Sequence, residues 1–461
     1  MARGAFTYRG IGMKRFRSLA LTLLVACSPI TPEETPTRNE PIGDSLPPMR
    51  SFSAGPVLVQ SRPNAEIARD FLDLAFQMES GRSLPVMSRF EGPISVRLTG
   101  NVGPTMADDL RDLLARLQSE AGVDIFLTSA PTARITVQAI PKATLSRSVP
   151  NAACFVVPNV TSWDEFLAAR RSSTLDWAEL TVRDQAAIFV PSDVSPQEGR
   201  DCLHEELAQA IGPLNDLYRL PDSVFNDDNM HAVLTSFDML VLRAYNGPDL
   251  HSGMTRTQVA GLLPDILSRL NPAGNYGQAR PVQPSTRTWI TQIETAMSSG
   301  NSALRRIAAA RQALSIAQSE GWTGPRLGFS AFVLGRLQVQ EDPMAARAAL
   351  ELAQRAYLAD PYSEVQQAHV AVQLAAFSLS GGANERTLDE VAKATAIAGK
   401  YKNAALLSTL LMFRAEAEEN LGHANDAAVA RLDSQAWARY GFGSERNVRS
   451  REREVAALNP H

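Results

Sequence analysis

Cysteine is scarce in this sequence, and the spacing of the few cysteines excludes two common kinds of structural site. The 461 residues contain Cys27, Cys154 and Cys202, and no Cys-x-x-Cys pair occurs. Three scattered cysteines are too few for a disulfide-rich scaffold and lack the spacing of a thiolate zinc site. A chain of this length has room for two or three domains, each with its own hydrophobic core.

The sequence also lacks an excess of positive charge. Lys and Arg number 45 against 49 Asp and Glu, which gives a formal net charge of -4. A nucleic-acid-binding protein would show a basic excess, so we expect no nucleic-acid partner. Hydrophobic residues make up 44% and charged residues 20% of the chain. This balance is typical of globular domains, not of disordered chains or membrane-embedded bundles.

The amino-terminal segment has the pattern of a bacterial export signal. Basic residues between 14 and 17 are followed by an apolar run over 19–26 and then by Cys27. The sequence Leu24-Val25-Ala26-Cys27 resembles the lipoprotein lipobox, in which the precursor is cut before the cysteine and the cysteine is acylated. The resemblance implies a palmitate-type lipid anchor on Cys27. Ser28 in the next position favours the outer membrane, facing the periplasm, as the location in the cell envelope.

If Cys27 is lipidated, only Cys154 and Cys202 remain to pair in a compartment that permits disulfides. A bridge between them would close a loop of about fifty residues and stabilise the fold by roughly 4 kcal/mol. The alternative is two unpaired cysteines buried as small hydrophobic side chains. The sequence leaves both alternatives open.

Hydrophobic periodicity and proline content divide the chain into regions. The middle region mixes helical spacing over 71–78 and 106–121 with strand-like stretches at 94–98, 124–127, 134–139, 177–181 and 186–190. Beyond a proline-rich stretch the strand patterns stop and helical patterns continue. We predict a signal with the lipobox cysteine over 1–27, a disordered tether over 28–62, a mixed domain over 63–270, a linker over 271–286, helical repeats over 287–442 and a charged, solvated tail over 443–461.

One helix of the middle region has clear boundaries in the sequence. Ser195 with Glu198 three residues later forms a capping-box pattern with Pro196 at the first helical position, and Gly212 is a typical stop. The pattern predicts a helix from Pro196 to about Ile211. Its apolar stripe contains Leu203, Leu207 and Ala210, and Glu205 and Gln209 lie on nearly the opposite side.

The same helix resembles the active-site helix of metzincin metallopeptidases, whose pattern is H-E-x-x-H-x-x-G-x-x-H. Aligning Gly212 with the glycine places Glu205, Gln209 and Asn215 at the three metal-ligand positions and Glu206 at the general-base position. Every histidine of the pattern is replaced. The dipeptide His204-Glu205 belongs to another register and fails, because the next ligand position is alanine.

The stretch E-E-x-x-Q-x-x-G-x-x-N-D, here Glu205 to Asp216, resembles an uncharacterised domain family of bacterial lipoproteins over about residues 65 to 270. The resemblance implies an α+β zincin-like domain, with a mixed sheet and an active-site-type helix, but no established activity. Ser223 to Asn226 is similar to the turn below a metzincin site, with Phe225 where methionine is usual. Gly212, Ser223 and Phe225 are therefore the expected turn residues.

The donor atoms of Glu205, Gln209 and Asn215 are all oxygens, so zinc affinity should be weak. We expect no cofactor other than a weakly bound divalent cation such as Ca²⁺, Mg²⁺ or Mn²⁺. Without a strong Lewis acid, Glu206 has no acidified water to deprotonate. A second interpretation of these residues is a pair of carboxylates that act without metal. A third is a solvated helix face with no site.

The carboxy-terminal half has the pattern of an all-α domain of helical hairpins. Alanine-rich amphipathic segments recur in pairs every 34 to 40 residues or so. The pairs are 289–298 with 303–320, 327–338 with 343–358, 363–379 with 387–399, and 404–421 with 424–440. Ala349, Ala353, Ala356 and Pro361 resemble the second helix of a tetratricopeptide repeat. The resemblance implies a stacked array that binds a protein or peptide, and a scaffold that merely covers the first domain is the alternative.

These patterns together predict a lipid-anchored envelope protein that binds a protein or peptide without catalysis. The loss of every metzincin histidine favours this reading. The alternative is a divergent hydrolase of the peptidase type, with Glu206 as general base and Glu205, Gln209 and Asn215 holding a metal or the substrate.

Overall fold

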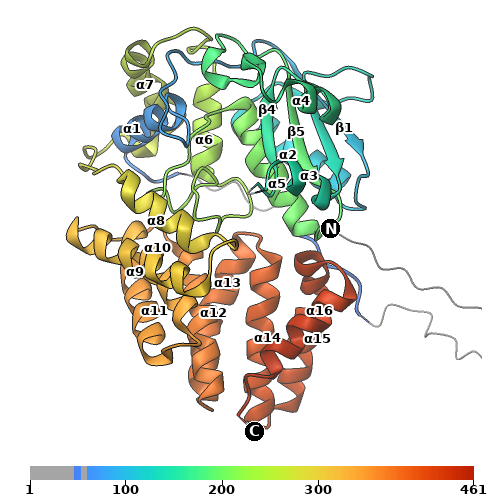
Figure 1. The fold of residues 1–461 in the computed structure, drawn as a ribbon, viewed down its shortest axis with the longest axis vertical. Helices are drawn as coiled ribbons and strands as arrows, with labels where there is room; N and C mark the ends of the chain where they lie inside the picture. Colours follow the sequence, from blue (N-terminus) through green and yellow to red (C-terminus); the bar gives the residue numbers. More distant parts are fainter. Residues whose placement is uncertain (1–45, 53–59, 151, 461) are drawn as a thin grey trace, which may run out of the picture. The chain divides into compact units, whose positions relative to one another are not determined.

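A computed structural model describes residues 46–52, 60–150 and 152–460. An α/β region with a five-stranded sheet comes first, and a region of packed helix pairs follows it (Figure 1). The predicted two-part fold class is therefore confirmed. The signal and the lipobox Cys27 lie outside the described residues. No helix in the described ranges has the length and apolar character needed to cross a membrane.

The sheet has the strand order β2-β1-β3-β5-β4. Neighbouring strands are parallel except at one edge, where β4 runs antiparallel to β5. The strands are β1 (Ile94–Gly100), β2 (Ile125–Leu127), β3 (Ile135–Ile140), β4 (Phe155–Pro158) and β5 (Ala186–Pro191). The short β4 was not predicted, because its residues Phe155 to Pro158 show no alternation of polar and apolar side chains and end in proline.

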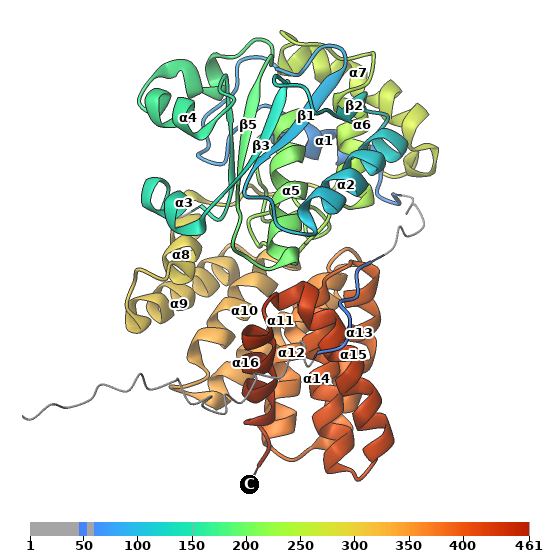
Figure 2. The same cartoon turned by 90° about the vertical axis from the view of Figure 1, so that its right-hand side faces the viewer.

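Both faces of β5 are covered, which explains its unbroken apolar sequence. Ile188 and Val190 face the core shared with α2 (Met106–Ala121) and α5 (Pro196–Ile211). The intervening Phe189 packs on the other face with aromatic residues of α4 (Trp163–Ala169), beside α3 (Lys142–Ser148). Figure 2 shows α3 and α4 on one side of the sheet and α2 and α5 on the other.

Two local predictions for this region were wrong. Residues 177–181, predicted as a strand, contain instead a short 3₁₀ helix over Trp177–Glu179. The Asp176 side chain accepts a hydrogen bond from Ala178 N and so starts a turn. The first helix, α1 (Asn64–Ala75), begins before the predicted 71–78 stretch because Pro63 sets its start. Helices α6 (Ser236–Tyr245) and α7 (Arg256–Leu270) complete this region.

The carboxy-terminal helices pack as successive hairpins, as predicted. Small residues let the helices approach closely. A Cβ on Gly441 would meet the Ala405 backbone at 2.6 Å, and one on Gly335 would meet Leu350 at 2.7 Å. The helices are α8 (Arg287–Met297), α9 (Ala303–Ser319), α10 (Pro325–Gln338), α11 (Pro343–Leu358), α12 (Glu364–Ser380), α13 (Asn384–Lys400), α14 (Ala404–Asn420) and α15 (Ala424–Phe442).

The predicted solvated tail over 443–461 is corrected by a further helix, α16 (Glu445–Ala456). Val448 and Val455 lie one heptad apart and are both buried in the helical core. Their spacing puts them on one face of the helix, while the charged residues occupy the remainder.

The predicted tether and linker are also partly packed. In the described part of the tether, Leu46 is buried, Arg50 N donates to Ala436 O at 3.0 Å, and the Phe52 ring stacks on Trp437. Within the linker, Arg280 forms an ion pair with Glu66 of α1 at 2.7 Å. Side chains on the neighbouring domains therefore order parts of both segments.

Hydrogen bonds and ring contacts join the α/β region to the helical hairpins within the compact unit that begins at Leu46. Tyr218 meets the edge of Trp289 on α8 with ring centroids 4.9 Å apart. The Tyr440 hydroxyl of α15 donates to Asp109 of α2 at 2.7 Å. Gln366 of α12 donates to the Pro221 carbonyl at 2.7 Å. The two regions thus share a polar and aromatic interface.

Candidate functional site

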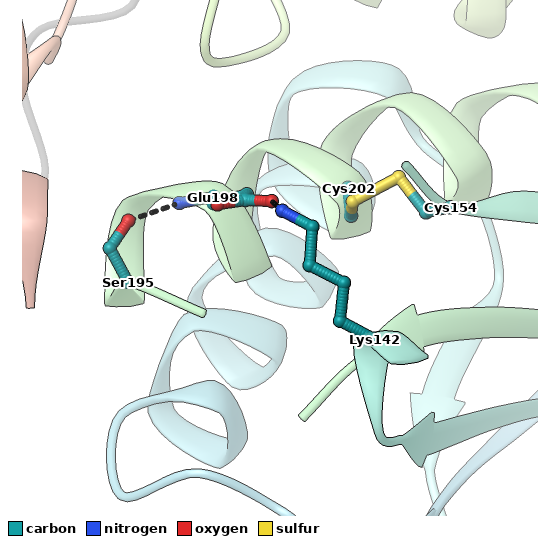
Figure 3. Close-up of a disulfide and its surroundings, with 5 residues drawn as sticks. All are labelled: Lys142, Cys154, Ser195, Glu198 and Cys202. Carbon is teal, nitrogen blue, oxygen red and sulfur yellow. Dashed lines mark hydrogen bonds and ion pairs between the residues drawn. A yellow bond between two sulfur atoms is a disulfide. The ribbon is translucent and has the colours of Figure 1, made fainter. Parts of the chain in front are cut away.

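The start of α5 follows the predicted cap only in part. Ser195 Oγ accepts a hydrogen bond from Glu198 N at 3.2 Å, and Pro196 occupies the first turn. The Glu198 carboxylate does not complete the capping box. It pairs with Lys142 Nζ at 2.7 Å instead (Figure 3). The helix nevertheless runs over the predicted Pro196–Ile211, because one cap bond and proline are enough to fix its start.

A disulfide joins Cys154, just before β4, to Cys202 on α5, with the two Cα atoms 5.9 Å apart (Figure 3). Of the two alternatives that the sequence left open, the structure has the bridge. It ties the edge strand to the helix that carries Glu205 and Glu206.

The far end of α5 depends on Arg183, a residue that the sequence analysis did not single out. Its side chain is 1% exposed. The guanidinium donates to Gln209 O at 2.8 Å and to Ala210 O at 2.7 Å, and also to the Tyr245 hydroxyl at 3.2 Å. Burial lowers the pKa of Arg183. The cation satisfies carbonyls that a helix terminus leaves without partners and opposes the negative end of the helix dipole.

Gly212 ends α5 for a different reason than the expected one. Its φ of -139° is ordinary extended backbone, not the left-handed conformation of a glycine stop. A Cβ at this position would lie 2.5 Å from Leu242 Cδ2 of α6 and 2.8 Å from Ala208 O. Glycine is therefore required because α6 passes close to the end of α5.

The predicted turn at Ser223 and Phe225 is buried and held by Asp238 of α6. Ser223 Oγ donates to Asp238 Oδ1 at 2.5 Å, and Val224 N donates to Asp238 Oδ2 at 3.2 Å. Phe225 N donates in turn to Ser223 Oγ at 3.0 Å. Burial raises the pKa of Asp238 to about 6 despite these donors.

The three predicted ligand side chains have different partners. Asn215 donates through Nδ2 to the Asp73 carbonyl of α1 at 2.9 Å. Gln209 points its Nε2 at Asp216 Oδ2, 3.4 Å away. Glu205 lies among carboxylates, since the charges of Glu79 and Asp227 act on it. Gln209 and Asn215 are both buried, so neither amide faces bulk solvent.

An acidic cluster, defined here as Glu79, Glu205, Glu206, Asp216 and Asp227, surrounds this side of α5. One carboxylate oxygen from each of Glu79, Asp216 and Asp227 lies within 4.8 Å of the other two. The charges of Glu79 and Glu205 act on Glu206. Sequence spacing could not reveal this grouping, because Glu79 belongs to a distant turn and Asp227 to a loop beyond the motif.

Burial is the main cause of raised pKa values in the acidic cluster, and repulsion between the carboxylates adds to it. The pKa of Glu205 and that of Asp227 each rise to about 7. Those of Glu206 and Asp216 rise well above their ordinary values. Glu206 is only 4% exposed, and its Oε2 has no hydrogen-bond partner among the described residues. Asp216 Oδ1 is likewise buried and without a partner there.

The histidines near α5 do not gather around the acidic cluster. His204 is buried and accepts a hydrogen bond from Leu234 N through Nδ1 at 3.1 Å. His231 contacts the Pro221 carbonyl at 2.7 Å through Nε2. His204 therefore has a structural hydrogen-bond partner, in agreement with the rejection of the H-E-x-x-H register.

Comparison with known proteins identifies the α/β region but gives it no activity. Residues 64–265 match the model of the family described as "Protein of unknown function (DUF2927)". Residues 64–265 form a DUF2927 domain. No curated protein matches the chain.

A junction cavity of about 370 Å³ lies between the DUF2927 domain and the helical hairpins. Side chains from α5, α10, α12 and α14 to α16 line it, together with the loop at 229–232. Its charged and titratable lining residues are Asp201, His231, Arg336, His369 and Arg451. A volume of this size is in the range of ordinary ligand pockets.

The junction cavity contains more cationic than anionic groups. No carboxylate lies within ion-pair distance of Arg336 in the described parts of the chain, whereas Arg451 pairs with Glu454 at 2.9 Å. Burial lowers the pKa of His231 and of His369 to about 4, so both rings are neutral at pH 7. Burial raises the pKa of Asp201 to about 7. The sequence analysis did not find this site, because its residues come from widely separated repeats.

Proposed function

We propose that this chain is a non-catalytic binding protein of the cell envelope, and that its junction cavity holds an acidic segment of a peptide or protein. The observation that carries the proposal is the guanidinium of Arg336, which lines the junction cavity without a carboxylate partner among the described residues. A second guanidinium, from Arg451, lines the same cavity. Guanidinium groups bind carboxylates through paired, charge-assisted hydrogen bonds.

Unsatisfied polar atoms support an anionic ligand at this place. Arg451 Nε, His231 Nδ1 and His369 Nε2 are buried and have no hydrogen-bond partner within the described ranges. Buried polar groups in native proteins nearly always have partners. A ligand carboxylate would satisfy the Arg451 Nε donor, whereas His231 Nδ1 and His369 Nε2 can donate to such a ligand only when the two rings are protonated.

The test is peptide binding to the purified full chain, followed by fluorescence anisotropy. A labelled hexaglutamate peptide should bind, whereas the matched hexaglutamine peptide should not. Arg336→Gln and Arg451→Gln should each weaken hexaglutamate binding about tenfold, the scale of one lost charge-assisted contact. Arg305→Gln, an exposed arginine of α9 outside the junction cavity, is the matched control. Equal binding of the two peptides would refute the proposal, as would unchanged binding in both cavity variants.

A divergent hydrolase is the second candidate, and the buried Glu206 favours it. Burial raises the pKa of Glu206 well above its ordinary value, which is how enzymes prepare a carboxyl to act as a general acid. Glu205 would then be its ionisable partner, as in other carboxylate pairs. Under this candidate, peptidase activity of the full chain should disappear in Glu206→Gln. A peptidase screen in which the wild type shows no activity above that of Glu206→Gln would exclude the hydrolase candidate.

We also propose that the DUF2927 domain descends from a metzincin-like fold. Three features support this ancestry: the antiparallel edge strand β4, the helix α5 directly after β5, and the chain reversal at Gly212 against α6. The loss of the metzincin histidines is consistent with a change from catalysis to binding.

The proposed location rests on the lipid anchor at Cys27. The Cys154–Cys202 disulfide supports it, because structural disulfides persist mainly in oxidising compartments such as the periplasm. Cys27→Ala should move the protein from the membrane to the soluble fraction of bacterial cells. If the Cys27→Ala variant stays in the membrane fraction, the proposed lipid anchor is wrong.

A further inference from the structure

We propose that Glu79, Asp216 and Asp227 bind one hard divalent cation, and that Ca²⁺ is the ion best suited to the site. Two separate segments supply these carboxylates, and one oxygen of each carboxylate lies within 4.8 Å of the others. Glu79 lies in the turn closed by the Gln77–Ser83 bridge, and the other two lie in the connection between α5 and α6. The ligand set differs from the one that the metzincin alignment predicts, and the inference does not depend on the junction cavity.

No basic residue forms an ion pair with these three carboxylates among the described residues. Arg287 is the basic group whose charge acts on Asp227. The nearby arginines have other partners: Arg219 pairs with Asp70 and Asp73 of α1. Carboxylates held this close repel one another unless a proton or a cation neutralises them.

An unpartnered side chain outside the trio also indicates a ligand. Glu206 is nine-tenths buried, its Oε2 accepts no hydrogen bond from the described residues, and its carboxylate is influenced by the charges of Glu79 and Glu205. Its carboxylate therefore lies within electrostatic reach of Glu79, one of the three proposed ligands. Asp216 Oδ1 is also buried without a donor. Neighbouring negative charges, together with buried acceptor oxygens that have no donor, are what a cation site provides before the ion binds.

The donor chemistry favours calcium over zinc and magnesium. All the available donors are oxygens, whereas zinc prefers imidazole and thiolate. Magnesium demands near-ideal octahedral geometry, but calcium accepts irregular sets of six to eight oxygens, some of them bidentate. Three ligands on two connecting segments suit the less demanding ion.

The test is calorimetric titration of CaCl₂ into the purified full chain after treatment with EDTA. One ion should bind per chain, with an affinity in the range of extracellular modules, about 0.1 to 1 mM. Glu79→Gln and Asp216→Asn should each weaken calcium binding at least about tenfold, since each removes one of three carboxylate ligands. The unfolding temperature of the wild type should rise with calcium, because the ion binds only the folded site.

Asp426→Asn is the matched control, because Asp426 belongs to the other close group of metal-capable side chains, with Glu418 near the end of α14 and His423 just before α15. It should leave calcium binding unchanged. In EDTA both site variants should unfold at or above the wild-type temperature, since a repelling charge is gone, so loss of binding would not reflect loss of fold. If Asp216→Asn fails to fold, Glu79→Gln on its exposed turn still decides the question. Absence of binding up to about 10 mM calcium, or binding that survives both substitutions, would overturn the proposal.

Discussion

The guanidinium of Arg183 lies 2.7 Å from the backbone oxygen of Ala210, in the interior of the protein. This contact joins the segment before β5 to the end of α5, the helix on which Glu205 and Glu206 lie. A buried cation thus fixes the helix end that precedes the reversal at Gly212. The position of the acidic cluster depends on this internal cap.

Replacing Arg183 should therefore destabilise the whole domain. Arg183→Met leaves the carbonyls of Gln209 and Ala210 and the Tyr245 hydroxyl without this donor. We expect a loss of about 2 to 5 kcal/mol in the free energy of unfolding. Urea denaturation would measure it, with the exposed Arg170→Met as control. A loss no greater than that of the control would mean that the cap contributes little.

The close approach of α6 to Gly212 predicts a steric penalty for the smallest side chain. Gly212→Ala should lower the free energy of unfolding by about 1 to 3 kcal/mol, because the new Cβ would overlap Leu242. Gly261→Ala on the exposed side of α7, where nothing lies within 4 Å of the new atom, should instead add up to about 1 kcal/mol through helix propensity. In a double-mutant cycle, Gly212→Ala should cost less in a Leu242→Ala background than in the wild type, and an equal cost in both backgrounds would contradict the packing argument.

Removal of the disulfide should destabilise the edge of the sheet. The bridge closes a separation of 48 residues, for which loop entropy predicts roughly 4 kcal/mol. The double variant Cys154→Ser and Cys202→Ser should unfold at correspondingly lower urea concentration. Dithiothreitol should shift the wild type in the same direction and leave the double variant unchanged. A shift of similar size in the reduced double variant would show that the reductant acts elsewhere.

Binding of acidic peptide in the junction cavity should strengthen as the pH falls from 7.5 to 5.5. His231 and His369 are neutral in the free protein because their pKa values are lowered to about 4. A bound carboxylate favours the protonated rings, so binding takes up protons. Asp201, with its pKa near 7, also loses its negative charge over this range. Arg336 and Arg451 keep their charge throughout.

The measurement is hexaglutamate affinity at both pH values, where we expect a several-fold increase at the lower pH. His369→Gln should reduce this pH dependence while leaving affinity at pH 7.5 nearly unchanged. The free protein should respond in the opposite sense, because a buried neutral histidine whose pKa is lowered stabilises the fold above about pH 6.5 and loses that contribution as the pH falls toward 4. Affinity that is flat or falls with acidification would contradict the proposed role of the histidines.

The sequence was sufficient where local signals act alone. The limits of α5 followed from Ser195, Pro196 and Gly212, and the hairpins followed from helical periodicity broken by turn residues. Strand β4 is an unbroken apolar run that ends in Pro158, so no alternation of polar and apolar residues marked it. The valines of α16 carried a helical signal seven residues apart, but the many charges around them suggested a solvated tail.

The candidate sites were harder to predict, because they are built from distant segments. The motif placed Glu205 and Gln209 on one face of α5, yet only the fold brings Glu79 and Asp227 to Asp216. Sequence spacing alone could not predict the partner of the Asn215 side chain, because its contact with the Asp73 carbonyl depends on where α1 packs. The junction cavity requires the hairpins and the DUF2927 domain together.

The loop between Gly212 and α6 belongs to both candidate sites. Asp227 contributes to the acidic cluster, Gln366 of α12 donates to Asp228 at 2.9 Å, and His231 lines the junction cavity. An ion and a peptide would thus act on neighbouring positions of one short segment. Thermodynamic reciprocity then fixes the relation between them: whatever factor calcium imposes on peptide affinity, the peptide must impose on calcium affinity.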